Sequence, residues 1–189
     1  GFKDGETFAV MESNGEGGSL FFHKSIPDDN GTIKDGVFTA IYPYKRKVPG
    51  RFELILPGLT IANNRPLVFY ANPGDTVHVE GKGEYPCLWS VRSKASEQKD
   101  WQMIQQATSA EELAYQKAKK DHYDYRMYRR ETKMDEAEWD RTGKLLQQKA
   151  TQVDSLQEVL HLAQLKAMKT LPMSDVWMQT LTIMTRSEE

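Results

Sequence analysis

The chain has 189 residues, with 25 Lys and Arg against 27 Asp and Glu and a net charge of −2. This near-neutral balance gives no overall field that would steer the protein to nucleic acid or to an anionic membrane, so we expect no nucleic-acid partner. The single cysteine, Cys87, excludes an intramolecular disulfide, a Cys-x-x-Cys redox pair and a thiolate zinc cage. We also expect no membrane span, because no apolar run approaches about 18 residues.

The first half of the sequence predicts short strands that are separated by turn residues. Gly, Pro, Asn and Asp interrupt runs of apolar and β-branched residues, and no helical pattern lies between these runs. This spacing favours an antiparallel architecture over a parallel one, and we expect an antiparallel β-sandwich of about seven or eight strands in residues 1–92. The predicted strands include Thr7–Glu12, Ser19–His23, Val37–Tyr42, Arg51–Leu56, Leu59–Ala62 and two within Leu67–Glu80.

The segment Leu67–Glu80 has the pattern of a strand, a tight turn and a second strand. Pro73 presets φ for a turn and Gly74 can adopt a positive φ, while apolar residues alternate on either side. The sequence therefore predicts a β-hairpin that nucleates the sheet.

From Ser93 the composition shifts towards Glu, Lys, Gln and Ala, which predicts a helical connector or arm over residues 93–189. Ser96 is a candidate N-cap for a first helix, and Ser109-Ala110-Glu111-Glu112 has the form of a capping box for a second. A further capping box, Asp135-Glu136-Ala137-Glu138, opens a long helix, and Ser174 is a candidate cap for the last one.

A heptad-like seam runs along the long helix, because its apolar and small residues alternate steps of three and four. The preceding helix has matching positions, so we expect a long antiparallel helical hairpin in a protein of the α+β class. The seam positions are Trp139, Thr142, Leu146, Lys149, Val153, Leu156, Leu160, Ala163 and Ala167 in the long helix, and Ala114, Ala118, His122 and Tyr125 in the preceding one.

Three stretches carry a family resemblance: 34–38 (Lys-Asp-Gly-Val-Phe), 50–54 (Gly-Arg-Phe-Glu-Leu) and 68–79, which contains the turn Asn72-Pro73-Gly74-Asp75. Together they resemble an N-terminal β-sandwich domain of unknown function found in exported bacterial envelope proteins. In those proteins a helical connector follows, and then a thioredoxin-like module of the TlpA/AhpC-TSA type. The resemblance implies an exported protein, in the periplasm or associated with the outer membrane, and an accessory role.

The resemblance does not transfer a redox activity, because the chain has one cysteine and no Cys-x-x-Cys motif. Our first hypothesis is a non-catalytic accessory region that positions a thioredoxin-like domain in cis or another partner. The alternative is a stand-alone envelope protein that binds a glycan or a peptide. An enzyme is the third hypothesis, since carboxylates on distant loops leave no signature in sequence. The sequence assigns no catalytic residue, cofactor or metal site, and it leaves the oligomeric state open.

Two basic stretches with interleaved aromatic residues are the first places to look for a partner-binding surface, because rings and cations can stack on sugars, peptides or single-stranded nucleic acid. One lies in a predicted loop and the other in a predicted helix, where neighbouring acidic residues favour a solvated helix face with packed rings. The candidate residues are Tyr44, Lys45, Arg46, Tyr125, Tyr128 and Arg129.

The histidines and the cysteine give no catalytic pattern. His23, His78, His122 and His161 are scattered along the chain without the spacing of a metal motif. Cys87 lies in an apolar stretch without a nearby histidine, so we expect a buried structural thiol rather than a nucleophile.

Overall fold

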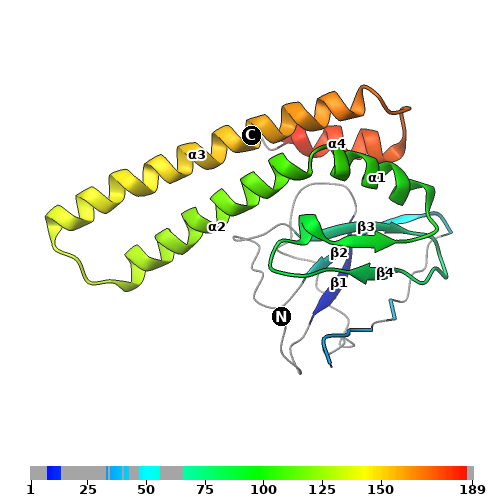
Figure 1. Cartoon of the computed structure of the whole chain (residues 1–189), viewed down its shortest axis with the longest axis horizontal. Helices are drawn as coiled ribbons and strands as arrows, with labels where there is room; N and C mark the ends of the chain where they lie inside the picture. Colours follow the sequence, from blue (N-terminus) through cyan, green and yellow to red (C-terminus); the bar gives the residue numbers. More distant parts are fainter. Residues whose placement is uncertain are drawn as a thin grey trace.

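A computed structural model describes residues 8–13, 33, 35–39, 41–42, 47–55 and 66–186. Within them, small β-sheets come first and helices follow (Figure 1). The strands are β1 (Ala9–Ser13), β2 (Gly50–Ile55), β3 (Leu67–Ala71), β4 (His78–Glu80) and β5 (Ser90–Arg92), and the 3-10 helix is η1 (Pro86–Leu88). The α-helices are α1 (Ser96–Ala107), α2 (Ser109–Glu131), α3 (Glu136–Met168) and α4 (Asp175–Arg186).

The main sheet is antiparallel with the strand order β1-β2-β3, and β4 pairs with β5 in a separate sheet. Side chains of a strand alternate between the two faces. Phe52 and Leu54 of β2 are therefore buried on one face, the inner face, while Arg51 and Glu53 project from the other, the outer face. Phe52 stacks on Phe69, its partner in register on β3, with ring centroids 5.4 Å apart.

The inner face of the main sheet packs into a first apolar core, to which the second sheet contributes Val91. Val77, Val79 and Trp89 pack at its margin, so both small sheets close on the same core. The buried members are Phe8, Ile33, Phe52, Leu54, Leu67, Phe69, Ala71 and Val91.

The outer face of the main sheet packs against helices and forms a second apolar core. Tyr70 of β3 is buried there with Ile104 of α1, Met168 of α3 and Val176 of α4, and Val68 packs beside them. Because β3 is covered on both faces, its sequence Leu-Val-Phe-Tyr-Ala lacks the polar alternation of a half-exposed strand.

Helix α1 covers the free edge of β3. The Tyr70 backbone N–H donates to Gln98 Oε1 at 2.8 Å, and the Trp101 indole N–H donates to the Val68 carbonyl at 3.1 Å. These two side chains satisfy strand groups that would otherwise be unpaired at a sheet edge.

The predicted β-sandwich of about seven or eight strands is wrong. The described residues form five strands in two small sheets, and helices cover the outer face of the main sheet. The α+β class is confirmed. Alternation and turn spacing detect individual strands, but they do not show what covers the second face. Of the other predicted strands, 19–23 and 59–62 lie outside the described residues. Among the described residues of 37–42, only Val37 takes part in a β-bridge.

The predicted hairpin in Leu67–Glu80 is also wrong, although its turn is right. The Asp75 N–H donates to the Asn72 carbonyl at 3.1 Å, and Gly74 has a φ of +78°. After this turn, however, β4 pairs with β5, whereas β3 pairs with β2. The reason lies at the edge of β3, where side chains of α1 occupy the groups that a returning strand would need.

Helices α2 and α3 form the predicted antiparallel hairpin (Figure 1). Thr142 and Leu160 of the predicted seam are buried. The side chain of Asp135 caps α3 by accepting the Glu138 N–H at 2.8 Å, as the capping box predicts, and Ser174 Oγ accepts the Trp177 N–H at 3.3 Å before α4.

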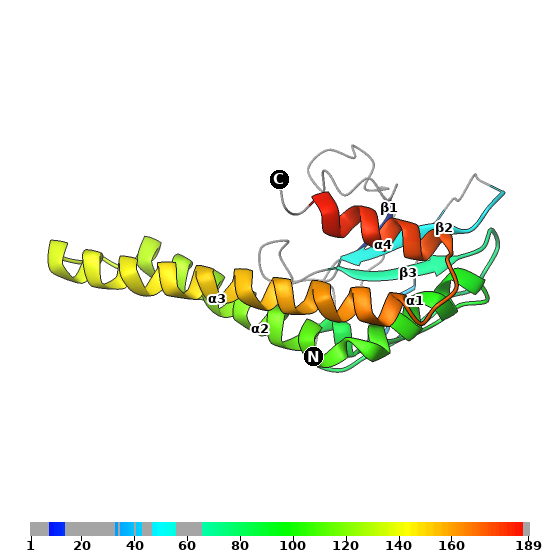
Figure 2. The ribbon, with the colours of Figure 1, turned by 90° about the horizontal axis from the view of Figure 1, so that it is seen from above.

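The hairpin both packs on the sheet region and projects from it. We call residues 115–157 the arm, and the sheets together with α1, α4 and residues 158–168 the base. The arm extends well beyond the base, and α4 folds back alongside the sheet (Figure 2). No helix in the described part of the chain is long and apolar enough to cross a membrane.

Candidate functional site

A cavity of about 280 Å³ lies in the base, between the outer face of the main sheet and the helices. Its described walls come from β2, β3, η1 and all four α-helices, so residues as far apart in sequence as Arg51 and Met184 meet around it. At about 30 Å³ per water molecule, the volume corresponds to about nine waters. The cavity is therefore large enough for a small organic ligand.

The sheet side of the cavity carries an ion pair. The Arg51 guanidinium donates to Glu53 Oε1 at 2.5 Å, and only 11% and 13% of the two side chains are exposed. Tyr70 lies opposite Arg51 in register, and its O–H donates to Gln179 Oε1 at 3.0 Å. Burial raises the pKa of Tyr70 to about 12, so this phenol stays protonated at neutral pH.

The helix side of the cavity carries buried amide groups. Gln116 of α2 is 2% exposed, and its Nε2 donates to Glu112 Oε1 at 2.9 Å. Its Oε1, in contrast, is buried without a hydrogen-bond partner. Gln164 of α3 lines the same cavity and is 5% exposed. Leaving a buried amide oxygen unpaired costs about 1–3 kcal/mol, so Gln116 is an exception that calls for an explanation.

Apolar and aromatic groups make up much of the remaining wall. Trp101 and Ile104 of α1 line it beside Val68 of β3, and Ile183 and Met184 of α4 line it as well. A mostly apolar wall with a few placed polar groups is the usual composition of a small-molecule site.

Cys87 lines the cavity from η1 and is half-buried, rather than fully buried as the sequence predicts. Burial, with a smaller contribution from the Glu112 carboxylate, raises the pKa of its thiol to about 11. The sulfur is thus a protonated thiol at neutral pH, which is the poorly nucleophilic form.

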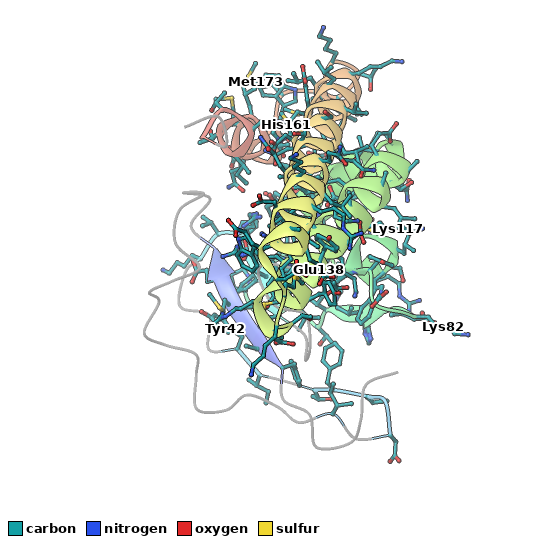
Figure 3. The ribbon with its side chains drawn as sticks, turned by 90° about the vertical axis from the view of Figure 1, so that its left-hand side faces the viewer. Tyr42, Lys82, Lys117, Glu138, His161 and Met173 are labelled. Carbon is teal, nitrogen blue, oxygen red and sulfur yellow. The ribbon has the colours of Figure 1, made fainter. Side chains whose placement is uncertain are left out.

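The three histidines in the described part of the chain lie on three different elements. His23 lies outside the described residues, His78 is exposed on β4 and His122 is half-buried on the arm. His161 lines the cavity and lies on the side of α3 that faces α4 (Figure 3). Among the described residues, no group of three or more His, Cys, Asp or Glu side chains is arranged to hold a metal ion.

The predicted partner-binding residues Tyr44, Lys45 and Arg46 lie outside the described part of the chain. The others, Tyr125 and Tyr128 among them, lie on the arm. The rings of Tyr125 and Tyr128 are 5.9 Å apart, and Lys149 Nζ lies 5.4 Å from the Tyr125 ring centroid. Tyr128 remains 47% exposed and is accessible to a partner.

Arg129 is engaged within the chain at the tip of the arm. Its guanidinium lies 3.9 Å from the Trp139 ring centroid and donates to Thr142 Oγ1 at 3.0 Å and to the Trp139 carbonyl at 2.8 Å. These contacts join the end of α2 to the start of α3. Arg129 therefore links the two helices, and its role in binding a partner stays a prediction.

The cavity could not be predicted from the sequence, because its lining residues are spread over seven elements. One signal was present in the helices: Gln116 and Gln164 lie on helix faces that are otherwise turned towards the protein interior. Amides at buried helix positions mark either an internal hydrogen bond or a polar site.

No family model, curated protein or solved structure matches this chain. The family resemblance of the sequence therefore stays a hypothesis.

Proposed function

We propose that this chain is a non-catalytic accessory module of an exported bacterial envelope protein, and that its arm positions a thioredoxin-like domain, in cis or on another chain. The proposed location and the kind of partner follow from the family resemblance alone. The observation that supports a positioning role is the arm itself, whose two helices are joined by side-chain contacts along its length.

These contacts lie at three levels of the arm. Near the base the Tyr115 O–H donates to Gln157 Oε1 at 3.1 Å. In the middle Lys149 forms an ion pair with Asp121, and at the tip Arg129 contacts Thr142 and Trp139. Contacts at three levels fix the register of the two helices, so the arm suits a role as a stiff spacer. With 33 residues α3 is about 50 Å long.

A photo-crosslinking experiment tests this role in the protein as its bacterium produces it. A photoreactive amino acid replaces Arg130, exposed near the tip, or Thr170, exposed at the base end of α3. We expect mass spectrometry to find crosslinks to a thioredoxin-like segment or protein from the tip and few from the base. Equal yields from both positions, or crosslinks only to proteins without a thioredoxin-like fold, would contradict the proposal.

Two further measurements test the other parts of the proposal. Cell fractionation should recover the protein with the periplasm or the outer membrane, and recovery in the cytoplasm would contradict export. Purified residues 1–189 should not catalyse the reduction of insulin disulfides. Turnover by this chain alone would show that it is an enzyme.

A further inference from the structure

The cavity in the base has a polar group that the fold leaves unused. Gln116 is 2% exposed, and its Oε1 has no hydrogen-bond partner although its Nε2 is bonded to Glu112. If the amide had only a structural role, the desolvation of its Oε1 would destabilise the fold without a compensating hydrogen bond. A ligand hydroxyl in the cavity would supply the missing donor. We propose that the cavity binds a small neutral ligand rich in hydroxyl groups, of the size of a single sugar ring.

The charges of the described wall favour a neutral ligand. Arg51 is already paired with Glu53 at 2.5 Å, and Glu112 adds a negative charge on the helix side. An anionic ligand would meet this carboxylate without an uncommitted guanidinium to balance it. A cationic ligand would have to lose its hydration against a carboxylate that already accepts a hydrogen bond from Gln116.

The size and the polar groups favour a polyhydroxylated ring. The volume of about 280 Å³ accommodates one such ring. Glu112, Gln116 and Gln164 offer carboxylate and amide oxygens that accept from hydroxyl groups, and the amides also donate. Trp101 and Ile104 on α1 provide an apolar surface against which the C–H face of a sugar can pack.

None of the described partner-binding candidates, Tyr125, Tyr128 and Arg129, lines this cavity. The proposed site also does not depend on the positioning role of the arm, because the residues in the argument lie on the base or, like Glu112 and Gln116, near the start of α2.

Ligand titration by NMR tests the proposal with defined probes on the full chain. The probes are the methyl glycosides of glucose, galactose and mannose, together with glucosamine as a cationic ring and glucuronate as an anionic one. We expect at least one neutral glycoside to bind with a dissociation constant of about 1 mM or tighter and to shift the side-chain amide signals of Gln116 and Gln164. The signals are assigned by their loss in the variants Gln116→Leu and Gln164→Leu.

The same variants test the site. Each should weaken glycoside binding about tenfold through the loss of a hydrogen bond, while Gln148→Leu, on the exposed side of α3, should have no effect. Gln116→Leu removes an unpaired polar atom but also the hydrogen bond to Glu112, so its melting temperature should stay close to that of the unmodified chain. If Gln116→Leu does not fold, the binding affinity of Gln164→Leu and the shifts of the side-chain amide signals show whether the glycoside binds in the cavity.

Three results would overturn the proposal. The first is the absence of binding by every neutral glycoside. The second is tighter binding of glucosamine or glucuronate than of the neutral rings, which would assign the cavity to a charged ligand. The third is glycoside binding that neither glutamine variant weakens, which would place the sugar elsewhere on the protein.

Discussion

The base and the arm share one continuous helix, α3, but different forces hold them. In the base, Ile104, Met168 and Val176 are at most 1% exposed and pack in an apolar core against the sheet. In the arm, the helices are joined by hydrogen bonds and an ion pair, and the predicted seam is only partly buried. Apolar burial contributes most of the stability, whereas each polar contact contributes about 1 kcal/mol or less. We therefore expect substitutions in the base to unfold the protein and those in the arm to act locally.

The largest effect should come from shortening a core side chain of the base. Ile104→Ala removes buried carbon atoms from a side chain that is 1% exposed, and it should lower the free energy of unfolding by about 2–5 kcal/mol. Leu146→Ala, at a half-buried seam position of the arm, should lower it by about 1 kcal/mol. Urea denaturation followed by circular dichroism measures both. Equal losses at the two positions would show that the arm is as tightly packed as the base.

The next effect is a pH dependence of the free energy of unfolding, caused by Tyr70, which lies between the main sheet and the helices. Burial raises the pKa of Tyr70 from 10.0 to about 12, so the folded state keeps a proton that the unfolded state loses. This contribution to stability is fully present below pH 10 and is lost as the pH rises to about 12, by about 2–3 kcal/mol in total. Urea denaturation between about pH 9 and about pH 12 should show this fall.

The variant Tyr70→Phe separates this residue from the other groups that titrate in alkali. It removes the titrating hydroxyl together with its hydrogen bond to Gln179, so the variant should be about 1 kcal/mol less stable at neutral pH. Its stability should then fall less steeply than that of the unmodified chain above pH 10. The same steepness in both proteins would show that Tyr70 does not contribute to the alkaline transition.

A smaller and more local effect is expected at the tip of the arm. Arg129→Ala removes the contact with the Trp139 ring and two hydrogen bonds. Amide hydrogen exchange in residues 130–140 should become about tenfold faster, while the base keeps its protection. Arg126→Ala, at an exposed position one turn earlier, is the matched control and should leave exchange unchanged. Faster exchange throughout the base would contradict a local role.

The helices could be predicted from the sequence because their signals are local. Asp135 and Glu138 lie three residues apart, and the capping interaction that they predict forms. Single strands such as β2 were also detectable from alternation. Strand pairing could not be predicted, because it depends on residues far away in sequence. Gln98 and Trp101 cover the edge of β3 that the predicted hairpin required.

The candidate sites also differ in whether their signals are local in sequence. The sequence identified the basic and aromatic stretch of α2, but it could not show that Arg129 packs on Trp139, since the two residues lie on different helices. The cavity was not predictable, because Arg51, Gln116 and Gln164 have no common motif and meet only after the helices have packed on the sheet. The sequence does place Gln116 and Gln164 at interior helix positions. Such a position indicates a polar site only when the residues around it are known.

The smallest effect should come from the ion pair in the middle of the arm. Asp121 and Lys149 join α2 to α3, with 57% and 20% of their side chains exposed. In a double-mutant cycle of Asp121→Ala and Lys149→Ala we expect a coupling energy of about 0.5 kcal/mol, because solvent screens a pair this exposed. Adding salt should reduce the coupling further. The pair would then serve to fix the register of the helices rather than to stabilise the fold. A coupling of about 2 kcal/mol or more that persists in salt would mean that the arm, like the base, is held by desolvated contacts.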